Sequence, residues 1–281
     1  MLGLLLLQVL ASCLWLGHSK VVNSFADCPE FFYAGTTPND ALHPQNPAWI
    51  CQRYRNSSHY ATLYDRDRRI PVYSAYKYHP GPAKRPHVWW FVEPQLIGKN
   101  DLQEIERESV LINQHKFTLD QIKKSQAVLD DYDKKTGLTR GHLNPNGHMD
   151  SKENKTATFS LTNIVPQDKS LNDGQWNKYE SKTMTEMSKD CTTTYVITGA
   201  VPGSTNVAGG RVNRPSHIWS AACCLVGTQP KKSWGVIAEN NKNQVENHSL
   251  GELENRLTSL YGERRVTLFN SACPREQASL P

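Results

Sequence analysis

The sequence predicts an α+β fold with a mainly antiparallel central sheet flanked by helices. Runs typical of strands gather around two or three helical segments, without the βαβ alternation that indicates a parallel sheet. No internal repeat, low-complexity tract or Pro/Gly linker divides residues 20–281, a length that one domain often fills. We therefore expect a single domain over this range.

The N-terminal part of this domain is expected to start irregularly and to continue as a β-hairpin. Residues 20–49 carry four prolines, which interrupt regular structure. Residues 60–64 and 70–76 are rich in residues that favour strands, and a charged turn joins them. This pattern is typical of a hairpin.

Three helices are predicted from capping signals and apolar periodicity. Thr118 and Gln121 have capping-box spacing, which indicates a helix from there to about residue 129. A second helix is expected over 172–189, where apolar side chains recur on one side. Ser249 opens another capping box, and the leucines that follow at helical spacing continue until Gly262. Further strands are predicted over 156–165, 194–198, 217–226 and 233–238.

The first residues are almost wholly apolar, over a stretch shorter than the ~20 residues that span a bilayer comfortably. The stretch ends in small residues at Gly17 and Ser19, which suit a signal peptidase. Residues 1–19 are therefore predicted to be a cleaved signal peptide, with a retained anchor as the alternative. We expect a secreted, extracellular protein without stable membrane association after cleavage.

Cysteine usage agrees with secretion. Six cysteines remain beyond Cys13, an even number that is typical of disulfides in a secreted chain. Cys28 is expected to pair with Cys51, which would fasten the N-terminal arm to the body. The adjacent Cys223 and Cys224 are expected to face opposite ways on a strand and to reach different partners. Three triplets of the N-glycosylation type begin at Asn56, Asn154 and Asn247.

Charge gives a weaker signal about partners. The net charge of +5 and the isoelectric point near 8.7 favour a polyanionic partner only mildly. Five arginines between residues 53 and 69 strengthen this locally, although for most of them a solvated charged face is the favoured interpretation.

The run Arg140-Gly141-His142-Leu-Asn-Pro is the strongest functional signal. A histidine with a pKa near neutrality can accept a proton from water, and an arginine can hold a phosphate. Gly141 is expected to permit a backbone conformation closed to other residues. Two further polar runs follow, Leu-Thr-Asn-Ile-Val-Pro-Gln at 161–167 and Leu-Asn-Asp-Gly-Gln-Trp at 171–176. Together these residues suit hydrolysis of a phosphodiester.

These runs resemble the DNA/RNA non-specific endonuclease family, the metal nucleases with a ββα core and a catalytic histidine. The resemblance extends over roughly residues 60–273 and implies the same α+β architecture with a ββα-metal core. It implies that His142 is the general base, that Arg140 binds the phosphate, and that Arg85 stabilises charge on it. DNA and RNA are the implied substrates, cut with little sequence preference.

The resemblance also implies a Mg²⁺ site, with Mn²⁺ as an alternative ion. Asn172 is the implied ligand, and Glu180, about two helical turns further on, would accept hydrogen bonds from the ion's water ligands. An ordinary helix N-cap is the alternative for Asn172, and a surface carboxylate is the alternative for Glu180. Asn163 is implied near the substrate, although a satisfied turn before Pro166 explains it equally well.

Two residues qualify this assignment. His148 is predicted to be incidental, because a zinc pair of His142 and His148 lacks further obvious ligands. The family motif begins with Asp three residues before the histidine, where this chain has Thr139. We therefore expect a nuclease weakened relative to the family. The alternative is a catalytically inactive member that binds nucleic acid or another extracellular partner.

Overall fold

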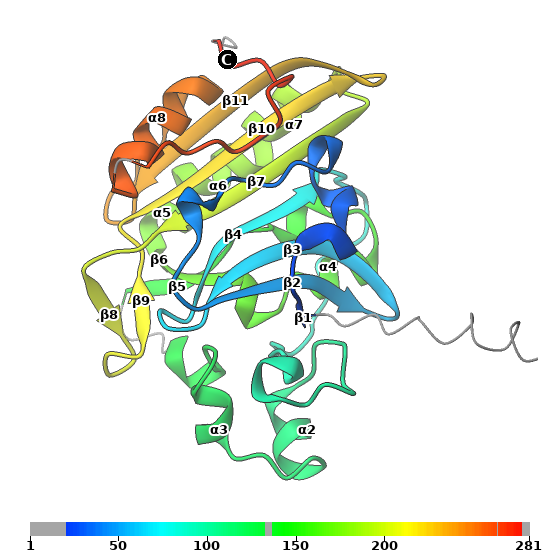
Figure 1. Cartoon of the computed structure of the whole chain (residues 1–281), viewed down its shortest axis with the longest axis vertical. Coiled ribbons are helices and arrows are strands. Elements are labelled where there is room, and N and C mark those ends of the chain that lie inside the picture. The colour runs from blue at the N-terminus through cyan, green and yellow to red at the C-terminus, as the bar shows by residue number, and fades with distance from the viewer. Residues whose placement is uncertain (1–20, 133–136, 263, 277–281) are drawn as a thin grey trace, which may run out of the picture.

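The computed structural model describes residues 21–132, 137–262 and 264–276, and its centre is an eight-stranded antiparallel sheet (Figure 1). The signal peptide expected at residues 1–19 lies outside the described residues. The strand order in the large sheet is β1-β2-β3-β4-β7-β10-β11-β12. Two small two-stranded sheets, β5-β6 and β8-β9, accompany it. The predicted α+β class is thus confirmed.

The elements have the following bounds. The strands are β1 Val21–Val22, β2 Pro47–Tyr54, β3 Ser57–Asp65, β4 Ile70–Lys77, β5 Leu138–His142, β6 Ile164–Asp168, β7 Thr193–Val201, β8 Thr205–Val207, β9 Val212–Arg214, β10 His217–Val226, β11 Gln229–Glu239 and β12 Glu246–His248. The helices are α2 Glu108–Asn113, α3 Leu119–Lys123, α4 Lys152–Ala157, α5 Lys169–Asp173, α6 Gln175–Lys178, α7 Met184–Ser188 and α8 Leu250–Leu260.

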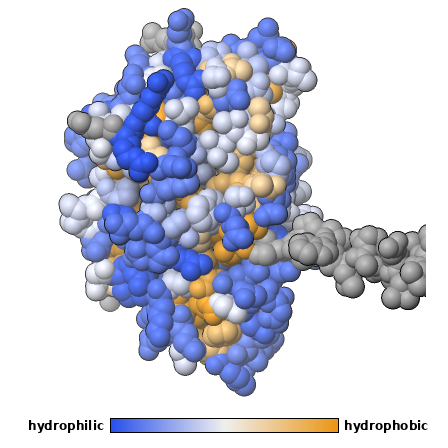
Figure 2. Space-filling view, viewed as in Figure 1, coloured by the Kyte–Doolittle hydropathy of each residue, from blue (hydrophilic) through white to orange (hydrophobic). Residues whose placement is uncertain are grey.

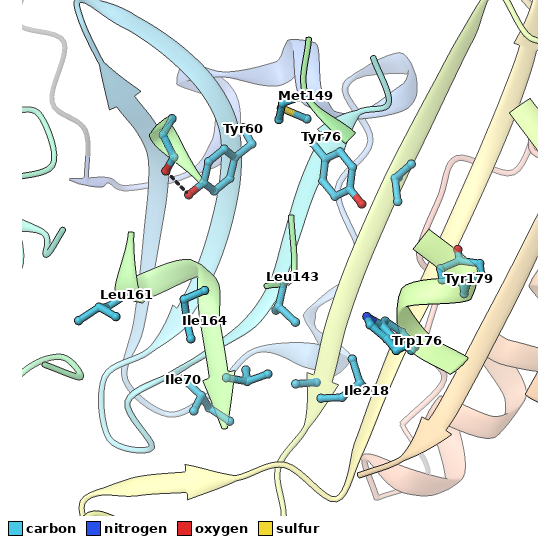
Figure 3. Packing of buried hydrophobic residues seen from close by; sticks show 14 of the residues in the cluster. Tyr60, Ile70, Tyr76, Leu143, Met149, Leu161, Ile164, Trp176, Tyr179 and Ile218 are labelled. Carbon is cyan, nitrogen blue, oxygen red and sulfur yellow. Dashed lines mark hydrogen bonds between the residues drawn. The ribbon is translucent and has the colours of Figure 1, made fainter. Parts of the chain in front are cut away.

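Helices cover both faces of the large sheet, and each face has its own hydrophobic core. On the face toward the viewer in Figure 1, α8 packs its buried leucines against β10 and β11. The capping box predicted at Ser249 is present and starts this helix. Behind the sheet, Trp176 and Tyr179 from the α6 region lie against the strands, as Figure 3 shows. The hydrophobic core on this far face, which includes Trp176 and Tyr179, supports the candidate site.

The surface on the α8 side is mainly hydrophilic, with hydrophobic side chains in smaller patches between the polar ones (Figure 2). Among the residues that the structure describes, no helix is long and apolar enough to cross a membrane.

Three disulfides join the six cysteines of the described chain. Cys28 pairs with Cys51, as expected. The adjacent Cys223 and Cys224 lie on β10, where successive side chains point to opposite faces. They reach different partners, Cys273 on the α8 side and Cys191 on the other, so the prediction of opposite directions is confirmed.

The hairpin and the later strands were well predicted, but the N-terminal region holds more structure than expected. Strands β3 and β4 form the predicted hairpin, with Ala61 opposite Ala75. The irregular arm ends at Pro47, where β2 begins, and this strand was not predicted. Proline can occupy the first residue of a strand, so its presence did not exclude one here.

The strand predicted over 156–165 is wrong. The chain there completes α4, makes a 3-10 turn at Leu161–Asn163 and only then enters β6. The alternating polar residues are not on a solvent face. The hydroxyls of Ser160 and Thr162 are buried and donate to the Glu93 carboxylate at 3.1 and 3.2 Å. A buried polar network thus produced the period that resembled a strand.

Two helix predictions were too simple. The helix from Thr118 has its capping box but ends at Lys123 rather than near residue 129. The helix expected over 172–189 starts earlier, because the Asp168 carboxylate accepts two backbone N–H groups at 2.9 and 3.1 Å. Gly174, with φ −105° and ψ −113°, separates α5 from α6. A π-helical turn at Tyr179–Thr183 then separates α6 from α7.

Candidate active site

The candidate site is built on a ββα unit. Strands β5 and β6 pair antiparallel, with Thr139 opposite Gln167 and His142 opposite Ile164, and α5 follows β6 directly. Residues two apart on a strand share a face, so Arg140 and His142 project to the same side. The unit thereby places a cation and an imidazole next to each other.

Gly141 is required in β5 for space rather than for an unusual backbone conformation. It is not among the described glycines with positive φ, so the sequence-based reason for it is wrong. A Cβ atom at this position would lie 2.1 Å from Oε1 and 2.7 Å from Cβ of Gln167. The Gln167 side chain therefore lies directly against the Gly141 backbone.

Two aromatic rings frame the catalytic candidates. The Trp90 ring centroid lies 5.4 Å from that of His142, and Cζ of Arg140 lies 5.2 Å from the same Trp90 centroid. Phe159 packs edge-on against His142 at 5.6 Å. Arg85 reaches this cluster from a separate segment, with Cζ 5.1 Å from the Phe159 centroid. The structure therefore brings Arg85, Arg140 and His142 together.

Burial of the imidazole lowers the pKa of His142 to about 3, and the positive charge of Arg85 acts in the same direction. The ring is consequently neutral at physiological pH, but this pKa lies well below the near-neutral value expected of a general base and makes the imidazole a weaker base. Its Nε2 atom is buried and has no hydrogen-bond partner among the described residues.

These side chains open into one cavity of about 730 Å³. The two arginines and His142 form part of its wall, and Thr139 lies beside them. Residues from the α5–α7 region form another part of the wall. The lining residues from that region are Asn172, Asp173, Asn177, Glu180, Ser181 and Thr185.

Asn172 lies inside α5, so the N-cap alternative for it is excluded. Asp168 caps α5, and the N-cap of α6 is Gly174. Glu180 lies in the π-helical turn, and both residues line the same cavity. Burial raises the pKa of the Glu180 carboxyl to about 8, against the opposing effects of Trp176 and Arg85. A cation beside this carboxyl would favour its charged form.

The oxygen donors present fit a magnesium-type ion better than zinc. The Asn172 amide and the Glu180 carboxyl supply oxygen, and Mg²⁺ commonly keeps several waters with one or two protein ligands. The described residues contain no group of three or more His, Cys, Asp or Glu side chains arranged to hold a metal.

Asn163 does not reach the substrate side of the site. It is fully buried, and its Oδ1 accepts from the Asn144 N–H and the Ser74 hydroxyl, both at 2.9 Å. Its Nδ2 donates to the carbonyls of Asn144 and Thr158 at 3.0 and 3.1 Å. The expected substrate contact is therefore corrected, because Asn163 instead holds the chain that follows His142.

His148, which is predicted from the sequence to be incidental, lies beside the other site residues. It is 3% exposed, lines the cavity and contacts the main-chain oxygen of Glu180 through Nε2 at 3.0 Å. A polar row on the cavity wall, formed by Asn177, Ser181 and Thr185, was not predicted from the sequence. Its spacing of four residues, which places side chains on one helical face, was a usable signal.

Comparison with known proteins identifies the family. Residues 37–261 match the profile described as DNA/RNA non-specific endonuclease. The chain belongs to this family. The chain is 33% identical over 219 residues to human Endonuclease domain-containing 1 protein, and 31% identical over 217 residues to the Mus musculus protein of the same name. The matches cover 75% of this chain but 41% of each relative, so the chain spans less than half of their length.

A solved structure of an EndoG/EndoGI complex is also similar to this endonuclease-family chain. The TM-score is 0.48 at 16% identity, and the match covers 75% of this chain and 84% of the other. The family resemblance expected from the motifs is confirmed by the profile and the two relatives.

Proposed function

We propose that this family member is a secreted, Mg²⁺- or Mn²⁺-dependent endonuclease that hydrolyses phosphodiester bonds of DNA and RNA. One observation carries the proposal. His142, Arg140 and Arg85 share a single cavity with the oxygen donors Asn172 and Glu180, although these residues come from separate parts of the sequence. A base, two cations and a site for a hard ion are the groups that phosphodiester hydrolysis requires.

In the proposed mechanism, the neutral imidazole of His142 accepts a proton from the attacking water. Arg140 and Arg85 hold the phosphate and stabilise the negative charge that increases in the transition state. Asn172 would hold the ion through its amide oxygen, and Glu180 would support its water ligands. When bound, the ion supplies positive charge for the phosphate and the departing oxygen.

Low sequence preference follows from the kinds of contacts proposed. The cations and the ion address the phosphate, and phosphate contacts position a nucleic acid without carrying base information. The net charge of +5 is compatible with attraction to a polyanion.

Thr139 is the observation that favours the second candidate, an inactive family member that binds nucleic acid or a protein. Thr139 lines the cavity at the position where the family motif has Asp, and it brings no negative charge.

Degradation of supercoiled plasmid and of RNA, with Mg²⁺ and then with excess EDTA, separates the two candidates. The nuclease proposal predicts cleavage of both polymers that EDTA abolishes. Intact polymers in Mg²⁺, Mn²⁺ and Ca²⁺ alike, together with retained binding, would establish the binding module instead.

We propose secretion from the signal peptide predicted at residues 1–19 and from the three disulfides, which suit an oxidising compartment. Asn56 and Asn247 are exposed and suit glycosylation, whereas the Asn154 side chain contacts His59 and donates to Asp150 at 2.6 Å. Protein collected from culture medium should begin near Lys20, lose mass on glycosidase treatment and titrate no free thiol. Free cysteines throughout would contradict this assignment.

A further inference from the structure

The segment that passes the catalytic candidates alternates between exposed and less exposed side chains. Arg85, His87 and Trp89 are exposed, whereas Pro86 is buried and Trp90 is partly buried. Trp89 is 69% exposed, more than any other large hydrophobic side chain among the described residues.

The segment reaches the catalytic cavity at both of its ends, through Arg85 and Trp90. Arg85 lines the cavity and lies over Phe159, with Cζ 5.1 Å from the ring centroid. Trp90 lines the same cavity and packs on the same Phe159 ring, with the centroids 5.1 Å apart. Trp89 precedes Trp90 in the chain, so its backbone lies at the cavity rim with its indole in solvent.

We propose that Trp89 is a stacking platform for an unpaired nucleobase of a strand whose phosphate lies at Arg85. A flat indole beside cations is the combination by which single strands are held without sequence preference, because every base has a π-face. Bases inside a duplex are stacked on each other and do not offer that face. The substrate class selected by this surface is therefore single-stranded DNA or RNA and locally unpaired duplex.

The inference rests on the proposed function only in that the phosphate lies at Arg85. It does not require that the strand be cut. His142→Ala protein in EDTA therefore provides a binding assay that is independent of cleavage. Three ligands of equal length separate the contributions: a single strand with bases, an abasic strand with the same phosphates, and a duplex.

In that assay, the double variant His142→Ala/Trp89→Ala should bind the base-bearing single strand about 5- to 150-fold more weakly than His142→Ala alone. This is the range expected for loss of one stacked base. Affinity for the abasic strand should change less than two-fold, and Trp89→Phe should restore most of the affinity for the single strand. Arg85→Ala should weaken all three ligands and reduce the salt dependence by about one phosphate contact. Val226→Ala, which truncates another exposed hydrophobic residue (43%), is the matched control.

The outcomes distinguish this inference from the proposed function. Unchanged single-strand affinity in Trp89→Ala, or an equal loss on the abasic strand, would overturn the stacking role even if the wild-type protein cleaves. Selective loss on the base-bearing strand would support the stacking role even if the wild-type protein cleaves nothing.

Discussion

The Nε2 atom of His148 donates a hydrogen bond to the main-chain oxygen of Glu180 at 3.0 Å, because a carbonyl can only accept. In the neutral ring, Nδ1 then accepts from the Tyr76 hydroxyl at 2.9 Å. Tyr78 packs edge-on against the same imidazole, with ring centroids 4.8 Å apart. His148 thus joins strand β4 to the π-helical turn that carries Glu180.

Replacing His148 with Phe should move the Glu180 turn while keeping an aromatic ring in the core. Outer-shell contacts of this kind typically change metal affinity or activity ~10–100-fold. We expect the Mg²⁺ concentration for half-maximal plasmid cleavage to rise within that range. Tyr76→Phe removes one hydroxyl and leaves the bond to Glu180, so it should have a smaller effect. Equal Mg²⁺ requirements in all three proteins would show that His148 is structural only.

The buried imidazole of His148 should also make stability depend on pH. Burial lowers the pKa of His148 to about 4 in the folded protein, below its ordinary value of about 6.5 when unfolded. Between these values the unfolded state binds the additional proton, so this contribution to stability is complete above about pH 6.5 and is lost as pH falls toward 4.

Burial raises the pKa of the Glu180 carboxyl, so protonation of Glu180 acts in the opposite direction. The comparison must therefore be with a His148→Gln variant that retains Glu180. From pH 7 to pH 5, the unfolding free energy of wild type should fall relative to that variant by on the order of 2 kcal/mol. Urea denaturation at the two pH values measures this difference. Parallel pH profiles would contradict the neutral buried imidazole.

Asn172→Ala should impair Mg²⁺-supported cleavage with little loss of stability, because Asn172 does not cap a helix. Asp168→Ala is the matched control, since its carboxylate caps α5. Loss of such a cap typically costs about 0.5–2 kcal/mol. Mg²⁺ titrations should therefore show a raised Mg²⁺ requirement for Asn172→Ala, with its melting temperature nearly unchanged. Thermal melts should show a lowered melting temperature for Asp168→Ala, with its Mg²⁺ requirement nearly unchanged. Full activity of Asn172→Ala at ordinary Mg²⁺ would remove Asn172 from the ion site.

Thr139→Asp should raise nuclease activity or lower the Mg²⁺ requirement. The substitution places a carboxylate in the cavity wall, where it can orient a neighbouring donor or a water of the ion. The expected effect is ~10–100-fold at limiting Mg²⁺, with little change in melting temperature because the two side chains are similar in size. A drop in activity with unchanged stability would show that the threonine is the better residue in this chain.

Local patterns in the sequence predicted those elements that depend on local chemistry. The capping box at Ser249 and the leucine spacing after it predicted α8, and two runs of strand-favouring residues joined by a charged turn predicted β3 and β4. The pairing of Cys28 with Cys51 was also predicted.

The remaining features depend on tertiary contacts that no local pattern encodes. The Ser160 hydroxyl is buried against Glu93, which lies 67 positions earlier. The alternation of polar residues around Ser160 was therefore misread as a strand. The need for glycine at position 141 comes from the Gln167 side chain on the neighbouring strand, which leaves no space for a Cβ atom. The role of His148 depends on Glu180, 32 positions later, in a helix whose π-turn has no signal in the sequence.

The proposed mechanism requires that the neutral imidazole of His142 activates water in a metal-dependent nuclease. Single-turnover cleavage of supercoiled plasmid at saturating Mg²⁺, by wild type and His142→Ala, tests it most directly. His43→Ala, which alters an exposed histidine outside the cavity, is the control. We predict that His142→Ala loses about 10²–10⁴-fold in rate with its melting temperature preserved. A rate within a few-fold of wild type would remove His142 from the proposed mechanism.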